Sequence, residues 1–80
     1  MLEELSATNK IVGIKQLRRA LAEGRVKKVF IARDADPMLT EPVLAQCEQQ
    51  QIAVESVPTM KQLGEACGVE VKTASAGILQ

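Results

Sequence analysis

The chain contains no histidine, tryptophan or tyrosine, only one phenylalanine and only two cysteines. Without histidine, neither a Ser-His-Asp triad nor a Cys-His pair can form, and two cysteines alone do not complete a closed zinc site. No phosphate-binding loop of the GxxxxGK type is present. We therefore expect no catalytic residue, no metal site and no cofactor. The single aromatic residue also argues against the nucleic-acid-binding modules that stack bases on aromatic side chains.

The length of 80 residues fits one domain, which we expect to span residues 1–80. No apolar run approaches the roughly 20 residues that a membrane-spanning helix needs. The first residues lack the basic start and the apolar stretch of a secretory signal. Two cysteines, Cys47 and Cys67, are too few for a disulfide framework. These features predict a cytoplasmic protein without a membrane partner.

The cations are unevenly distributed along the chain. Eight of the ten Lys and Arg residues lie between positions 10 and 33, where Glu23 is the only acid, so the net charge of zero conceals a basic segment and an acidic one. Clustered cations attract phosphates and release their counterions whatever the net charge is. The basic segment therefore favours a nucleic-acid partner, and the alternative is a solvated helix face followed by a charged turn.

Apolar residues alternate between helical and strand periodicity, with short connections. We expect helices over residues 2–7, 13–24, 37–50 and 60–67, and strands over residues 11–12, 28–32, 52–57 and 73–79. The apolar run Val29–Ala32 predicts a central strand that is covered on both faces. Strands separated by helical crossovers predict an α/β fold, a three-layer α/β/α sandwich on a mixed four-stranded sheet.

The expected helices carry recognisable ends. Asp36 and Pro37 are typical of an N-cap and a first helical position, and Thr59 with Gln62 has the spacing of a capping box. Glycines at positions 24 and 68 predict helix C-termini. The helix over residues 37–50 is expected to present four side chains inward: Leu39, Val43, Leu44 and Cys47.

Two segments carry candidate binding residues. In the first, Gly13 and Ile14 open a helix whose unpaired N–H groups and positive dipole end suit phosphates. Gly13 lets a ligand approach closely, Lys15 and Arg19 share a helix face, and Gln16 can donate to or accept from a base edge. A surface helix without a binding site is the alternative interpretation.

The second segment is the expected loop that contains Val69, Glu70 and Val71. Apolar side chains exposed on a loop can cover a base or a protein partner. The alternative is that one or both valines turn inward and pack in the core.

The spacing of three segments resembles a known family. These segments are Gly13-Ile14-Lys15-Gln16 with Arg19, Ala20 and Gly24, then Val29–Pro37, then Leu63–Val71. They resemble the kink-turn RNA-binding ribosomal proteins of the L7Ae superfamily, over roughly residues 9–79. The Lys-Gln pair is most similar to the bacterial, YbxF-like branch of that superfamily.

The resemblance implies an α/β/α sandwich that binds a kink-turn, a sharply bent duplex beside tandem sheared G·A pairs, in ribosomal or regulatory RNA. It implies that Lys15 and Gln16 read the sheared guanines and that Arg19 adds a backbone or base contact. It also implies that the loop over residues 69–71 packs on the extruded nucleotide. A monomer is expected, without catalysis.

The chain departs from the family at several positions. Many archaeal and eukaryotic members have Asn-Glu at positions 15 and 16, and members often have basic residues where this chain has Met60 and Glu65. These changes predict weaker or narrower kink-turn binding, for which Arg33 partly compensates from the end of the central strand. They also leave open a protein-interaction or assembly module on the same fold. A thiol enzyme is disfavoured, because neither cysteine has an activating cation or base nearby in sequence.

Overall fold

The computed structural model describes residues 9–80, and the helix expected over residues 2–7 lies outside this range. In chain order the elements are β1 (Lys10–Val12), α1 (Ile14–Ala22), β2 (Val26–Ala32), α2 (Pro37–Gln50), β3 (Ala53–Val57), α3 (Met60–Cys67) and β4 (Ser75–Leu79). The sheet order is β1-β4-β2-β3, with β2 and β3 parallel and β4 antiparallel to both of its neighbours. The mixed four-stranded sheet is therefore confirmed.

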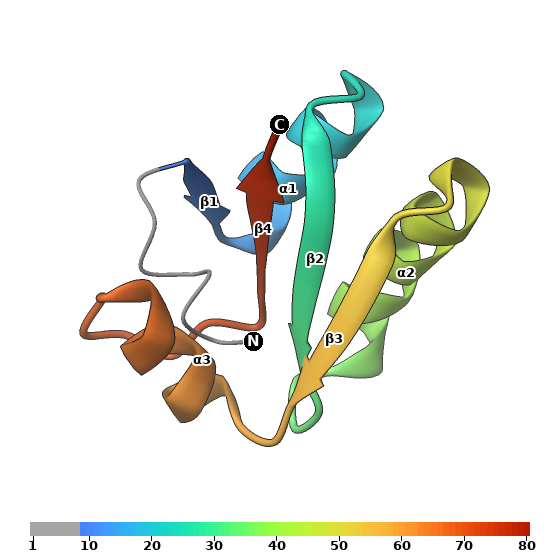
Figure 1. The fold of residues 1–80 in the computed structure, drawn as a ribbon. Coiled ribbons are helices and arrows are strands. Elements are labelled where there is room, and N and C mark those ends of the chain that lie inside the picture. Colours follow the sequence, from blue (N-terminus) through green and yellow to red (C-terminus); the bar gives the residue numbers. More distant parts are fainter. Residues whose placement is uncertain (1–8) are drawn as a thin grey trace.

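Helices cover both faces of this sheet (Figure 1). Helices α1 and α2 pack on one face, where Leu17 and Val43 meet Val29 of the central strand. Helix α3 packs on the other face, where Leu63 meets Phe30. Neighbouring residues of a strand point to opposite faces, so the apolar run of β2 supplies both cores. The three-layer sandwich and the central strand covered on both sides are confirmed.

Strand β2 begins two residues earlier than expected and contains an irregularity. Its pairing with β4 shifts register between Val26 and Lys28, so Val26 faces the same core as Val29. Lys28 and Phe30, two residues apart, share a face of the strand, so the Lys28 Nζ lies 5.1 Å from the ring centroid, and it also forms a 3.2 Å ion pair with Glu55. This pairing lowers the pKa of the Glu55 carboxyl. One cation of the basic segment therefore contributes to strand pairing.

The expected helix ends are confirmed. The Asp36 carboxylate accepts the N–H of Met38 at 2.9 Å at the start of α2, and the Thr59 hydroxyl accepts the N–H of Gln62 at 3.0 Å at the start of α3. Gly68 caps α3 in the left-handed conformation with a φ of +78°. The remaining differences between expected and observed bounds are one or two residues, such as the start of β4 at Ser75.

The predicted inward face of α2 is partly wrong. Val43 and Cys47 are buried as expected, but Leu39 is 49% and Leu44 is 39% exposed, and Thr40 takes the remaining buried position. Each of the two leucines lies about 100° around the helix from a buried neighbour. On the side toward α1 the helix uses amides instead, since Gln46 and Gln50 donate to carbonyl oxygens of that helix. The sheet therefore covers only a narrow stripe of α2.

Both cysteine thiols are buried, and burial raises the pKa of each above the ordinary value near 9.0. A raised pKa in the folded state favours the protonated thiol, so its contribution to stability is complete about one unit below pH 9 and is lost as the pH rises through the raised pKa of the folded state. We expect the free energy of unfolding, from urea titrations, to fall between pH 8 and pH 10. The Cys47→Ala/Cys67→Ala protein, although less stable at pH 7, should lose less over the same interval. An equal loss in both proteins would contradict this assignment, and the chain has no tyrosine to titrate in this range.

Candidate nucleic-acid interface

Three segments that lie far apart in sequence meet at one edge of the sheet. Strands β1 and β2 end there and β4 begins there, since Val12 pairs with Ala76 and the Ala32 N–H donates to the Ala74 carbonyl at 3.0 Å. The Gly13 N–H donates to the Ser75 carbonyl at 3.1 Å, which fixes the start of α1 beside the start of β4. We call this edge, formed by residues 13–16, 33–36 and 69–74, the site edge.

Gly13 sets the direction in which α1 leaves the site edge. Its φ of +103° is a conformation that side-chain-bearing residues rarely adopt, and its carbonyl accepts the first helical hydrogen bond, from Leu17. A Cβ atom here would lie 2.9 Å from the Gln16 Oε1 atom. The Gln16 amide thus lies beside Gly13, but it is the end of a flexible, exposed side chain, and the close approach of a ligand at Gly13 stays a prediction.

Three of the predicted residues on α1 form a hollow. Lys15, Gln16 and Arg19 line a concavity of about 240 Å³ on the exposed face of the helix. Ile14 is half-buried and packs against the core on the α1 side of the sheet, so it anchors the helix start. The structure therefore brings the two predicted base-reading residues and the predicted phosphate contact to one surface.

The loop between α3 and β4 divides its two valines between core and solvent. Val69 is half-buried and packs against the α3 side of the core, whereas Val71 is 70% exposed. Glu70, between them, is also exposed. Val69 thus turns toward the core, as the alternative expected, whereas Val71 is exposed and its contact with a base or a partner stays a prediction.

Helix α3 holds this loop at both of its ends. The Val69 N–H donates to the Gly64 carbonyl and the Thr73 N–H donates to the Met60 carbonyl, each at 3.1 Å. Between these bonds the loop passes so close to the helix that a Cβ atom at Gly64 would collide with the Val71 carbonyl. The exposed Val71 side chain is therefore carried on a backbone that is fixed against α3.

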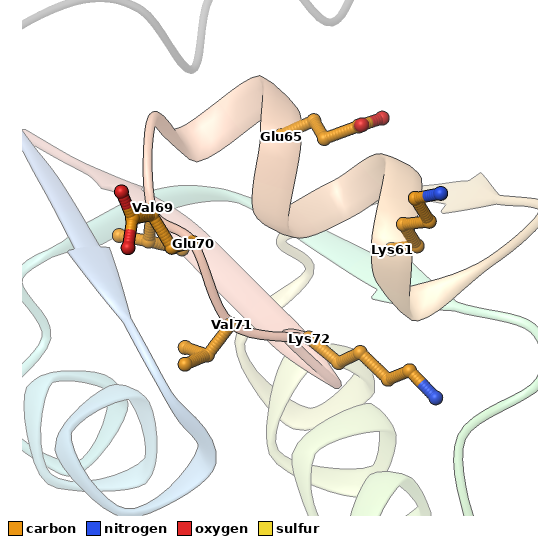
Figure 2. A pocket seen from close by; sticks show the side chains of 6 residues that line it. All are labelled: Lys61, Glu65, Val69, Glu70, Val71 and Lys72. Carbon is orange, nitrogen blue, oxygen red and sulfur yellow. The ribbon is translucent and has the colours of Figure 1, made fainter.

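A second hollow, of about 480 Å³, lies between this loop and α3 (Figure 2). Its lining comprises Lys61 and Glu65 of α3 with Val69, Glu70, Val71 and Lys72 of the loop. The two lysines are the only cations of the sequence outside the basic segment. Sequence reasoning missed them, although the position of Lys72 directly after Val71 was a signal that could have found it.

Arg33 lies at the site edge but lines neither hollow. It is exposed in the turn after β2, and its backbone N–H donates to the Val57 carbonyl at 2.8 Å. The next residue, Asp34, accepts the Met60 N–H at 2.7 Å and so ties this turn to the start of α3. Arg33 therefore shares the site edge with the other candidate residues but contributes to neither hollow, and its contact with RNA stays a prediction.

The fold separates the basic segment into two groups. Lys15, Arg18, Arg19 and Arg33 lie on α1 or at the site edge, whereas Lys10, Arg25, Lys27 and Lys28 lie in or directly before the strands β1 and β2. A seven-residue strand such as β2 spans about 23 Å, which is more than twice the screening distance at physiological salt. Arg25 and Lys27 therefore lie near the far end of β2, whereas Lys10 and Lys28, which both pair with Ile78, lie about 10 Å from the start of β4 at the site edge.

Within residues 9–80, no three side chains of the metal-ligating types come together, and no helix is long and apolar enough to cross a membrane. Neither Cys47 nor Cys67 lines one of the two hollows. The raised pKa of each buried thiol also disfavours the nucleophilic thiolate that a thiol enzyme needs.

The Gly64→Ala substitution tests whether the loop depends on its contact with α3. Helix propensity alone predicts a gain of up to about 1 kcal/mol, because Gly is the poorer helix former. The collision with the Val71 carbonyl predicts instead a loss of about 1–3 kcal/mol, the usual cost of overpacking. Urea unfolding decides between the two signs, and a variant more stable than the wild-type protein would contradict the close contact.

Comparison with known proteins agrees with this architecture. The family model of the ribosomal protein L7Ae/L30e/S12e/Gadd45 family matches residues 2–80. An RNA-binding protein of Geobacillus sp. (strain WCH70) is 38% identical over 76 residues, with 95% of this chain and 93% of the relative covered. The RNA-binding protein YbxF of Geobacillus stearothermophilus is 40% identical over the same length and coverage.

A solved structure, the Giardia lamblia 15.5kD RNA binding protein, superimposes with a TM-score of 0.87 at 27% identity, covering 99% of this chain and 68% of that chain. The relatives carry the names of binding proteins, and the family is not one of enzymes. The match over almost the whole length and the two relatives above show that the chain belongs to the ribosomal protein L7Ae/L30e/S12e/Gadd45 family, as a YbxF-like member.

Proposed function

We propose that this protein binds RNA without catalysis and recognises kink-turns in ribosomal or regulatory RNA. The observation that carries the proposal is the position of the hollow of Lys15, Gln16 and Arg19 beside the loop that exposes Val71. The bond from Gly13 to Ser75 holds these two surfaces at one edge. The names of the relatives as RNA-binding proteins support the same proposal.

The chemistry of α1 suits a distorted duplex. In an ordinary A-form helix the major groove is too deep and narrow for side chains, so base readout needs a bend or sheared pairs that open it. Lys15 can donate to the O6 and N7 atoms of guanine, and Gln16 can donate and accept at a base edge. Arg19, one helical turn later on the same face, can contact a backbone phosphate.

The loop complements this readout through apolar contact. Val71 is the most exposed apolar residue of the loop, and an unstacked base that leaves the duplex needs an apolar surface to cover it. A kink-turn extrudes such a nucleotide beside the G·A pairs. We propose that one protein monomer, acting in the cytoplasm, binds one kink-turn in this way.

A protein-interaction or assembly module remains the second candidate. The observation that favours it is a pair of exposed apolar side chains on the first turn of α2, Met38 at 81% and Leu39 at 49% exposure. Such a module would tolerate Lys15→Ala and Arg19→Ala in its interaction, whereas an RNA-binding protein would not.

The test is a titration at fixed salt and Mg²⁺ with a kink-turn RNA and with the same RNA after its G·A pairs become Watson–Crick pairs. Wild-type protein should bind the first RNA much more tightly. Gln16→Ala should reduce this discrimination by roughly 1–3 kcal/mol, because a base-edge contact is lost. Gln49→Ala, which removes an exposed amide from α2, is the matched control and should leave both affinities unchanged.

Equal, weak binding of wild-type protein to both RNAs would overturn kink-turn recognition and favour the assembly module. An equal loss of affinity for both RNAs in Gln16→Ala would instead assign this side chain to backbone positioning.

Arg19→Ala addresses the phosphate contact. The plot of log affinity against log salt should become shallower by about one unit, because each phosphate contact releases roughly one counterion. Arg18→Ala is the matched control, since Arg18 is exposed on the same helix but does not line the hollow. An unchanged slope in Arg19→Ala would rule out a backbone contact by this residue.

A further inference from the structure

We propose that Lys61 and Lys72 form a second phosphate-binding position, which holds an RNA backbone phosphate next to the nucleotide that covers Val71. This inference rests on the proposed RNA-binding function and extends the contact surface from α1 to the second hollow. Its ligand is a phosphate diester within a bound RNA, and the hollow is not proposed as a site for a free nucleotide.

The backbone brings the two lysines together from separate elements. Lys72 precedes Thr73, whose N–H donates to the carbonyl of Met60 at 3.1 Å, and Met60 precedes Lys61. The close contact of the Val71 carbonyl with Gly64 fixes the same stretch of loop against the helix. In Figure 2 both lysine side chains extend on the same side of the hollow.

Neither lysine has a partner within the part of the chain that the structure describes. By contrast, Lys28 pairs with Glu55 and Arg25 pairs with Glu23. A phosphate that enters the hollow between the two side chains would be attracted to both ammonium groups. Their chemistry suits a phosphate, to which a lysine side chain binds as a point charge.

The hollow also limits what it can bind. Glu65 and Glu70 line it together with the lysines, so its four ionisable side chains sum to a net charge of zero. Figure 2 shows Glu70 at the Val69 end of the hollow, away from the lysine amino groups, and Glu65 extending from α3 on the same side as Lys61, which lies one helical turn before it. A small free anion therefore gains little, whereas a phosphate delivered by RNA that already contacts α1 can be placed beside the lysines.

One RNA can reach both hollows. Lys72 is three residues from Ser75, Ser75 is bonded to Gly13, and Lys15 is two residues farther on. Chain geometry limits this path to about 20 Å, even if each segment were fully extended. A bent duplex with one extruded nucleotide spans such a distance at a single site.

The test uses the full-length chain and the kink-turn RNA described above. Lys61→Gln/Lys72→Gln should weaken binding and make the log affinity against log salt plot shallower by about one unit. Lys27→Gln is the matched control, because it removes an exposed lysine at the opposite end of the sheet, beyond the range of screening. Glu65→Gln should act in the opposite direction and increase affinity, because it removes a negative charge from the hollow.

Neutral methylphosphonate linkages then locate the contact. Replacing the phosphate on either side of the extruded nucleotide, one at a time, should weaken binding to wild-type protein at one of the two positions. The same replacement should have little further effect on Lys61→Gln/Lys72→Gln, because its contact is already absent. Equal losses in both proteins at both positions would overturn the assignment.

The failures of the two proposals are distinguishable. If wild-type protein shows no preference for the kink-turn, the proposed function itself fails. If the preference is present but the double variant behaves as Lys27→Gln does, only the second phosphate position is overturned. Binding of uridine monophosphate alone to this hollow, detected by NMR at low millimolar concentration and lost in the double variant, would also overturn it in favour of a separate nucleotide site.

Discussion

The close packing of α1 on β4 is the contact on which the rest of the structure depends. At Gly77 a Cβ atom would lie 2.6 Å from the Leu17 Cδ1 atom and 3.3 Å from the Val26 Cγ1 atom, so no side chain fits between helix and strand. Leu17 consequently rests on the strand backbone and is fully buried. Leu17 lies in sequence between Gln16 and Arg19 but on the buried side of the helix, so this contact sets how far the exposed side chains of Lys15, Gln16 and Arg19 stand from the sheet.

Helix α3, on the opposite face of the sheet, is also positioned by a close backbone contact at a glycine. There Gly64 lets the loop backbone lie directly on α3, and the loop continues into β4. One strand thus connects both surfaces: it carries α1 at Gly77 and receives the loop at Ser75. The Ser75 hydroxyl donates to the Phe30 carbonyl at 3.0 Å, which ties this junction to the central strand. The spacing of the two hollows is therefore a property of the scaffold.

Local chemistry made much of this fold predictable. Asp36, Thr59 and Gly68 act through bonds or backbone angles within a few residues, so the sequence alone was sufficient to place the helix ends. The inward face of α2 was not predictable in the same way. Helical periodicity permits more than one buried stripe, and the choice depends on how α2 rests on its neighbours: Gln46 and Gln50 bond to α1, and Leu39 and Leu44 stay exposed.

At the candidate site, too, local sequence predicted the residues that one element brings together but not those that tertiary packing brings together. Periodicity and family resemblance predicted the grouping of Lys15, Gln16 and Arg19, which one helix face determines. The clustering of cations in the sequence did not predict which of them lie at the site, because those on β2 lie away from the site edge. Lys61 and Lys72 were missed because eleven positions separate them in sequence, and their proximity depends on tertiary contacts of the loop with α3, namely the bond from Thr73 to Met60 and the close approach at Gly64.

The distribution of charge at the site edge bears on selectivity for the proposed RNA ligand. Asp34 and Asp36 are held there by their structural bonds to backbone N–H groups, and Glu65 and Glu70 line the second hollow. These acids offset the cations of the same edge, so a duplex that contacts one hollow alone gains little general electrostatic attraction. Binding to RNA of arbitrary sequence and shape is almost entirely electrostatic. The four acidic side chains therefore weaken this non-specific binding more than they weaken binding to a kink-turn. An RNA whose bend brings bases to Gln16 and phosphates to both hollows gains contacts that a straight duplex cannot make. The balance of acidic and basic side chains therefore favours selection of RNA by its shape over strong binding to RNA in general.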